Sequence, residues 1–140
     1  MSSFTTPLIV SPMSDGRSWK LVFPFEYHVG VKNSLTVIRV PSHFITDFAS
    51  VPRSFWGIIP PWGKYGKAAV IHDFLYCTKT YLNDTCTRQL ADEIFYEAML
   101  VLKVPKWQAK VMYYAVRWFG YLAWKYNKGH FEDFRLLDKT

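Results

Sequence analysis

Four side chains in two short stretches have the types and the spacing of a catalytic site. The run 72–76 reads His-Asp-Phe-Leu-Tyr, so Tyr76 follows His72 by four residues and lies on the same side of a helix. Asp92 begins a second apolar stretch, 94–100. If the two helices that these stretches predict pack antiparallel, Asp92 reaches the face that carries His72 and Tyr76. The pattern predicts either a hydrolytic site or a buried polar network.

A hydrolytic site would give each of these side chains a separate role. A neutral imidazole is a good base near pH 7, so His72 would take a proton from water if Asp92 held its other nitrogen. Tyr76 would hold Asp92 in place. Asp73 points about 100° away around the helix and would ligate a divalent cation that polarises the substrate oxygen. Calcium or magnesium needs further oxygens, which Asp47 and loop carbonyls would supply.

A structural network would use the same residues in a different environment. Buried polar groups need hydrogen-bond partners, so His72 would bond Asp92 in the interior while Asp47 capped a turn or the first helix. The two interpretations differ in solvent access. An enzyme needs His72 within reach of solvent and acidic ligands nearby, whereas a network would have His72 and Asp92 buried and bonded to each other.

The elements around these residues predict a single α+β domain over residues 1–140. Residues 1–45 favour a small antiparallel meander of three or four strands, because β-forming stretches alternate with turn residues. Prolines and glycines interrupt residues 46–66, where we expect a long loop ordered by its aromatic side chains. Three helices should follow, the first at about 67–81, the second from Thr85 or Thr87 to 102, and the third from Pro105 to 126. Residues 127–140 form a tail.

Apolar and aromatic side chains recur at helical spacing along the expected third helix. Core packing is the simplest role for such a stripe, and it is the role we expect. Basic residues interleave with the tryptophans, so a membrane interface or the groove of a partner would also fit. The stripe consists of Trp107, Val111, Tyr114, Ala115, Trp118, Leu122 and Tyr126.

The charge balance is basic, with 17 Lys and Arg against 11 Asp and Glu and a formal net charge of +6. This charge fits an acidic partner, either nucleic acid or an anionic membrane surface, or serves solubility alone. No nucleic-acid motif accompanies it. Half of the residues are apolar, which argues against disorder.

The two cysteines, Cys77 and Cys86, flank the expected connection between the first two helices, so a bridge between them is geometrically open. No signal peptide is recognisable, and in a reducing compartment we expect both to be free thiols. Two cysteines without other spaced ligands are too few for a zinc site. No apolar, uncharged run reaches the length of about 18 residues that a transmembrane helix needs.

Three blocks of sequence, at 40–53, 69–76 and 91–95, occur in an order that resembles a phage and prophage family known as domain of unknown function 1353. The resemblance extends over about residues 20–120, most of the chain. It implies a bacteriophage or prophage origin and no known activity. The expected location is then the host cytoplasm during infection, or the virion.

The helix pair by itself resembles the secreted phospholipases of the A-two type, in which a His-Asp-x-x-Tyr helix packs on a helix bearing an aspartate. That resemblance implies His72 as the base, Asp73 as a calcium ligand, and Tyr76 and Asp92 as the supporting pair. It covers roughly 35 residues. The glycine-rich calcium loop and most of the paired cysteines of that family are missing from this chain.

Two hypotheses follow, and a third stays open. The first is a phage-encoded, metal-assisted hydrolase that acts on an ester such as a phospholipid. The second is a non-catalytic virion, tail or assembly protein in which the same residues are structural. The expected partners are other phage structural proteins or an anionic membrane surface. An inhibitor or binder of a host component is the third hypothesis.

Overall fold

Short strands precede a group of helices in the computed structural model. The structure describes residues 3–4, 7–12, 19–30, 37–46, 66–81 and 84–126. The strands before the helices are β1 (Ser3–Phe4), β2 (Val10–Pro12), β3 (Trp19–Leu21), β4 (Phe25–His28), β5 (Val37–Val40) and β6 (Ile45–Thr46). The helices are α1 (Gly66–Thr78), α2 (Arg88–Val101), α3 (Lys106–Phe119) and α4 (Tyr121–Tyr126). This arrangement confirms the expected α+β class.

The N-terminal strands form two small antiparallel sheets. One has the order β1-β4-β5 and the other has the order β2-β3-β6. Side chains alternate between buried and partly exposed positions along β4, and the buried pair Phe25 and Tyr27 lies opposite Val40 and Ile38 of β5. This register turns one apolar face of the sheet toward the helices.

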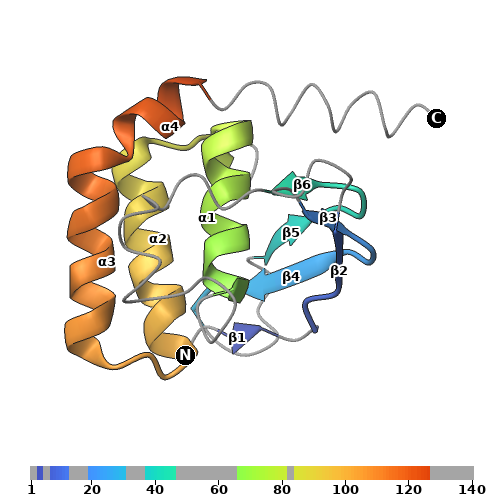
Figure 1. The fold of residues 1–140 in the computed structure, drawn as a ribbon, viewed down its shortest axis with the longest axis horizontal. Helices are drawn as coiled ribbons and strands as arrows, with labels where there is room; N and C mark the ends of the chain where they lie inside the picture. The colour runs from blue at the N-terminus through green and yellow to red at the C-terminus, as the bar shows by residue number, and fades with distance from the viewer. Residues whose placement is uncertain are drawn as a thin grey trace.

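Helix α1 lies in the middle of the fold, with the two sheets on one side and α2 on the other (Figure 1). Ten of its 13 residues are buried, which fits a helix that is apolar on nearly all sides. Helix α2 separates α1 from α3, and the three helices stand side by side (Figure 1). A hydrogen bond of 2.9 Å from the hydroxyl of Tyr27 to Glu97 joins the sheet to α2.

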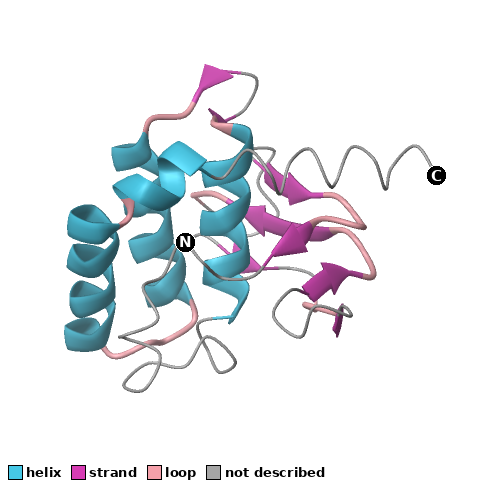
Figure 2. Ribbon diagram, turned by 45° about the horizontal axis from the view of Figure 1, so that its top comes forward, coloured by secondary structure: helices cyan, strands magenta, loops and turns pink. Residues whose placement is uncertain are grey.

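The connection between α1 and α2 contains a short strand pair where the sequence predicted helix to residue 81. The strands β7 (Thr80–Tyr81) and β8 (Asp84–Thr85) form a small antiparallel hairpin that lies apart from the two sheets (Figure 2). Thr87 then caps α2, as expected, and its hydroxyl accepts a hydrogen bond of 3.1 Å from the Leu90 amide.

The prediction of one continuous third helix is wrong, because the chain forms two helices, α3 and α4, that are separated at Gly120. A side chain at Gly120 would place its Cβ 2.4 Å from the Val116 carbonyl oxygen and 2.7 Å from the Tyr76 hydroxyl. Only glycine fits so close an approach. The break lets α4 turn over the end of α1, where Trp124 packs edge-on against Tyr76 at a centroid distance of 5.1 Å.

The expected core stripe of the third helix is also wrong for most of its members. Trp107, Val111, Tyr114 and Trp118 are all exposed. The buried face of α3 consists instead of Ala109, Met112, Ala115 and Val116. Two alanines on this face let the backbones of α2 and α3 approach each other, which large rings would prevent. Of the expected stripe, Ala115 alone is buried among the side chains that the structure describes.

No helix within the described ranges combines the length and the apolar character needed to cross a membrane.

Candidate functional site

Helix α1 supplies the first half of the candidate site. His72 and Tyr76 lie one turn apart, and their rings are 4.2 Å apart between centroids. The imidazole also stacks on Phe95 of α2 at 4.5 Å and an interplanar angle of 27°. Both side chains have zero solvent exposure. Aromatic packing therefore fixes the orientation of the imidazole on two sides.

Helix α2 supplies Asp92, and one of its carboxylate oxygens contacts both of these side chains. The Nε2 atom of His72 lies 2.7 Å from Asp92 Oδ1, and the Tyr76 hydroxyl donates to the same oxygen at 2.6 Å. Asp92 is also completely buried. The sequence prediction that Asp92 reaches the face of His72 and Tyr76 is confirmed.

Two arginines complete the surroundings of Asp92, and the sequence interpretation did not include them. Arg117 of α3 donates to Asp92 Oδ2 at 2.9 Å. Arg88 lies one turn before Asp92 on α2, 3.6 Å from the same oxygen, and donates at 3.0 Å to the carbonyls of Val116 and Arg117. The i,i+4 spacing was a signal for Arg88, whereas Arg117 required knowledge of how α3 packs.

These five side chains, His72, Tyr76, Arg88, Asp92 and Arg117, are called the Asp92 cluster below. Through them one carboxylate joins α1, α2 and α3. Burial alone would raise the pKa of Asp92, but the hydrogen bonds from His72, Tyr76 and Arg117 outweigh it and hold the pKa below its ordinary value. Burial raises the pKa of Tyr76 far above its ordinary value, and the Asp92 carboxylate raises it further. Tyr76 therefore remains a hydrogen-bond donor.

Asp73, the expected metal ligand, has a hydrogen-bond partner outside the Asp92 cluster. Its Oδ2 accepts a hydrogen bond of 2.7 Å from the Thr46 hydroxyl at the end of β6, and both residues are completely buried. Asp47, the second expected ligand, falls outside the described residues. Within the described ranges, no three His, Cys, Asp or Glu side chains gather closely enough to hold a metal ion. The expected calcium or magnesium therefore stays a prediction.

The two cysteines beside this region are free thiols, as expected, and both are buried. Burial raises the pKa of Cys86 to about 11, with a further contribution from the nearby charge of Asp92. A thiol with so high a pKa is a poor nucleophile at neutral pH.

The geometry of the Asp92 cluster has the elements of a base held by a carboxylate. A base must also touch the water or the substrate that gives up its proton. The imidazole of His72 has no solvent-exposed surface, so it cannot do so in this conformation. In this structure His72 and Asp92 are thus both buried and bonded to each other.

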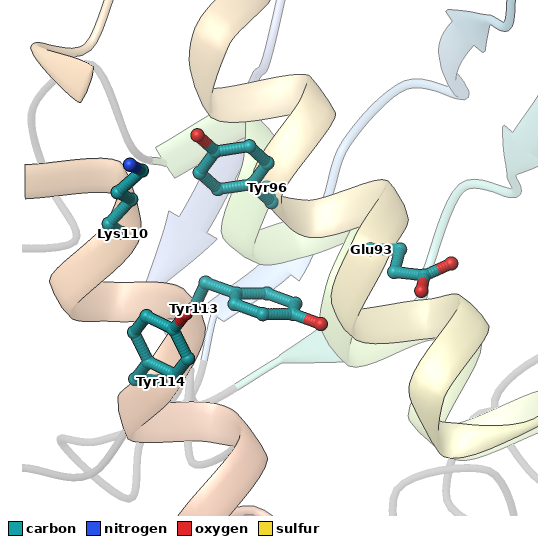
Figure 3. Close-up of a pocket in the computed structure, with 5 residues that line it drawn as sticks. All are labelled: Glu93, Tyr96, Lys110, Tyr113 and Tyr114. Carbon is teal, nitrogen blue, oxygen red and sulfur yellow. The ribbon is translucent and has the colours of Figure 1, made fainter. Parts of the chain in front are cut away.

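A hollow opens between α2 and α3, and it is lined by residues other than those that the sequence singled out as a site. Its volume is about 320 Å³, and Figure 3 shows Tyr113 and Tyr114 of α3 beside Tyr96 of α2, with Lys110 and Glu93 at its edges. The rings of Tyr96 and Tyr113 meet edge to face at 5.6 Å.

Comparison with known proteins gives a family but no activity. The family described as a protein of unknown function (DUF1353) matches residues 19–116. The uncharacterized protein y4jT of Sinorhizobium fredii (strain NBRC 101917 / NGR234) is 42% identical over 83 residues, which are 58% of this chain and 23% of that protein. This chain thus spans about a quarter of the length of that relative. No solved structure matches. Neither description mentions bacteriophages or phospholipases.

Proposed function

Because the chain belongs to the DUF1353 family, whose description states no activity, we propose a function from its own side chains: a non-catalytic virion, tail or assembly protein of a bacteriophage. The observation that supports the non-catalytic part is the complete burial of His72, Tyr76 and Asp92. The bacteriophage part is supported by the resemblance of the three sequence blocks described above. Its partners are other structural proteins of the particle or an anionic membrane surface, which the net charge of +6 favours.

The bonding of Asp92 favours a structural role for the cluster. Both carboxylate oxygens are engaged, Oδ1 by His72 and Tyr76 and Oδ2 by Arg117. Two arginine charges beside a carboxylate stabilise its ionised form. They also weaken the electrostatic attraction between the carboxylate and the imidazole. A carboxylate that joins three helices gains stability from every additional donor.

The test compares hydrolysis and stability in the same variants. Wild type, His72→Ala and the control His43→Asn are assayed on p-nitrophenyl esters and on phospholipid vesicles, with calcium or magnesium present. His43 is exposed and has a φ of 72°, which asparagine tolerates. We expect no hydrolysis by any of the three, and a lower urea midpoint for His72→Ala alone. Hydrolysis by wild type that disappears in a fully folded His72→Ala would overturn the proposal.

The hydrolase is the second candidate, and one observation favours it. The distances of 2.7 Å from His72 to Asp92 and 2.6 Å from Tyr76 to Asp92 are those of a base held by its orienting carboxylate. In this candidate Asp73 and Asp47 would hold a calcium or magnesium ion that polarises the ester. A crystal soaked with calcium or manganese tests it. An ion on Asp73 together with an opened path to His72 would support the hydrolase, and a sealed His72 without an ion would count against it.

A further inference from the structure

The segment 103–126, which contains α3 and α4, has an unusual surface. It carries five basic residues, Lys103, Lys106, Lys110, Arg117 and Lys125, and no aspartate or glutamate. It also carries six of the nine large apolar side chains that are exposed in the described part of the chain. One end of the fold thus combines positive charge with exposed rings.

Four of the exposed apolar side chains of α3 lie along a single line. Trp107, Val111, Tyr114 and Trp118 follow one another at intervals of four, three and four residues, so they occupy one face of the helix. Tyr121, at the start of α4, is exposed as well. This set of five side chains is called the aromatic face below. It is distinct from the buried face of α3, and at Tyr114 it borders the hollow between α2 and α3.

The basic residues lie beside the aromatic face on the same helix. At about 100° per residue, Lys106 and Lys110 fall to one side of the line of rings, and both are exposed. Tryptophan and tyrosine carry an apolar ring with a polar tip, which suits the boundary between lipid and water. Lysines next to such rings are attracted by the headgroups of anionic lipids.

We propose that the aromatic face docks on the surface of a lipid bilayer that contains anionic lipids. The rings enter the headgroup layer, and Lys106 and Lys110 lie over lipid phosphates. This inference rests on the proposed function, which gave an anionic membrane surface as one of two kinds of partner, and it names the side chains that would bind that surface.

Charge and shape favour a bilayer over a protein partner. A second copy docked face to face would bring two uniformly basic segments together, and like charges oppose such a contact. An acidic protein would need a groove shaped to receive rings that stand out from the helix, since Trp118 is 71% and Trp107 61% exposed. A fluid headgroup layer closes around such rings without a preformed shape.

The test measures the sedimentation of the full chain with lipid vesicles. One set of vesicles is pure phosphatidylcholine and the other also contains phosphatidylglycerol. We expect binding to the anionic vesicles, little binding to the neutral ones, and release at high salt. Lys106→Gln with Lys110→Gln should lower the partition coefficient about fivefold for each lysine removed. Trp107→Ser with Trp118→Ser should lower it about tenfold or more.

A matched control keeps the result specific to this face. Phe23 is 58% exposed and follows β3, at a distance in sequence from the basic segment, so Phe23→Ser should bind as wild type does. Urea unfolding of each variant checks that the fold is intact. We expect the midpoints to equal that of wild type, because the replaced side chains are exposed. Equal binding by wild type and the tryptophan variant would overturn the proposal. The proposal would also be overturned if wild type bound no lipid but formed a dimer that Trp118→Ser disrupts. It would likewise be overturned if wild type bound an acidic protein and no lipid.

Discussion

Replacing Asp92 by alanine tests the central claim about the Asp92 cluster, that one buried carboxylate holds three helices together. The change removes the acceptor of three side chains at once. The His72 ring nitrogen and the Tyr76 hydroxyl would stay buried without it, at a cost of about 1–3 kcal/mol each. Arg117 is 27% exposed and can turn partly to water, so it adds less. The expected loss is about 4 kcal/mol, within the range of about 3–5 kcal/mol for a broken buried pair.

Urea unfolding followed by circular dichroism measures this loss. With a slope of about 2 kcal/mol per molar urea, the midpoint of Asp92→Ala should fall by about 2 M. The matched control is Glu93→Ala, which removes the next carboxylate along α2. Glu93 is exposed, and it accepts a hydrogen bond of 3.2 Å from Gln89, so its loss should cost less than about 0.5 kcal/mol. If the two midpoints differ by less than about 0.5 M, which is about 1 kcal/mol, the cluster does not hold the helices together.

Three further predictions follow from the same region. Folding lowers the pKa of Asp92, so the ionised carboxylate contributes its full stability above the ordinary pKa of about 3.9. This contribution disappears as the pH falls through the lower pKa of the folded state. The difference in unfolding free energy between wild type and Asp92→Asn should therefore narrow below about pH 4, and a constant difference would contradict this. Cys86, with its pKa raised to about 11, should react with a disulfide reagent only after urea unfolds the chain, so rapid reaction of the native protein would refute its burial. Gly120→Ala should cost about 1–3 kcal/mol in urea unfolding, because its Cβ would overlap the Val116 carbonyl and the Tyr76 hydroxyl; an unchanged midpoint would mean that the break between α3 and α4 relaxes freely.

The meeting of His72, Tyr76 and Asp92 could be predicted from sequence because helical periodicity is local. Two residues four apart share a face whatever the rest of the fold does, and neighbouring helices in sequence commonly pack together. Arg117 could not be predicted, since its contact depends on the packing of α3 against α2. The burial of His72 could not be predicted either, because exposure is decided by the whole chain.

The third helix shows where periodicity stops being informative. A line of rings identifies an apolar face, but it does not say whether that face meets the core or the solvent. In α3 the core side is built from small residues such as Ala109 and Ala115, which carry less apolar surface than the rings and are easily overlooked. The break at Gly120 depends on the Tyr76 hydroxyl, 44 positions earlier, and so left no local signal beyond the glycine itself.

The sharing of Asp92 by two arginines has a consequence for how this family can change its sequence. A buried carboxylate that loses its cations would be left uncompensated, whereas the two arginines are partly exposed and can turn to water. Positions 88 and 92, which lie within the residues 19–116 that match DUF1353, should therefore vary together with position 117, which directly follows that range. A relative that has lost both arginines is expected to carry an uncharged residue at position 92, because that side chain is completely buried.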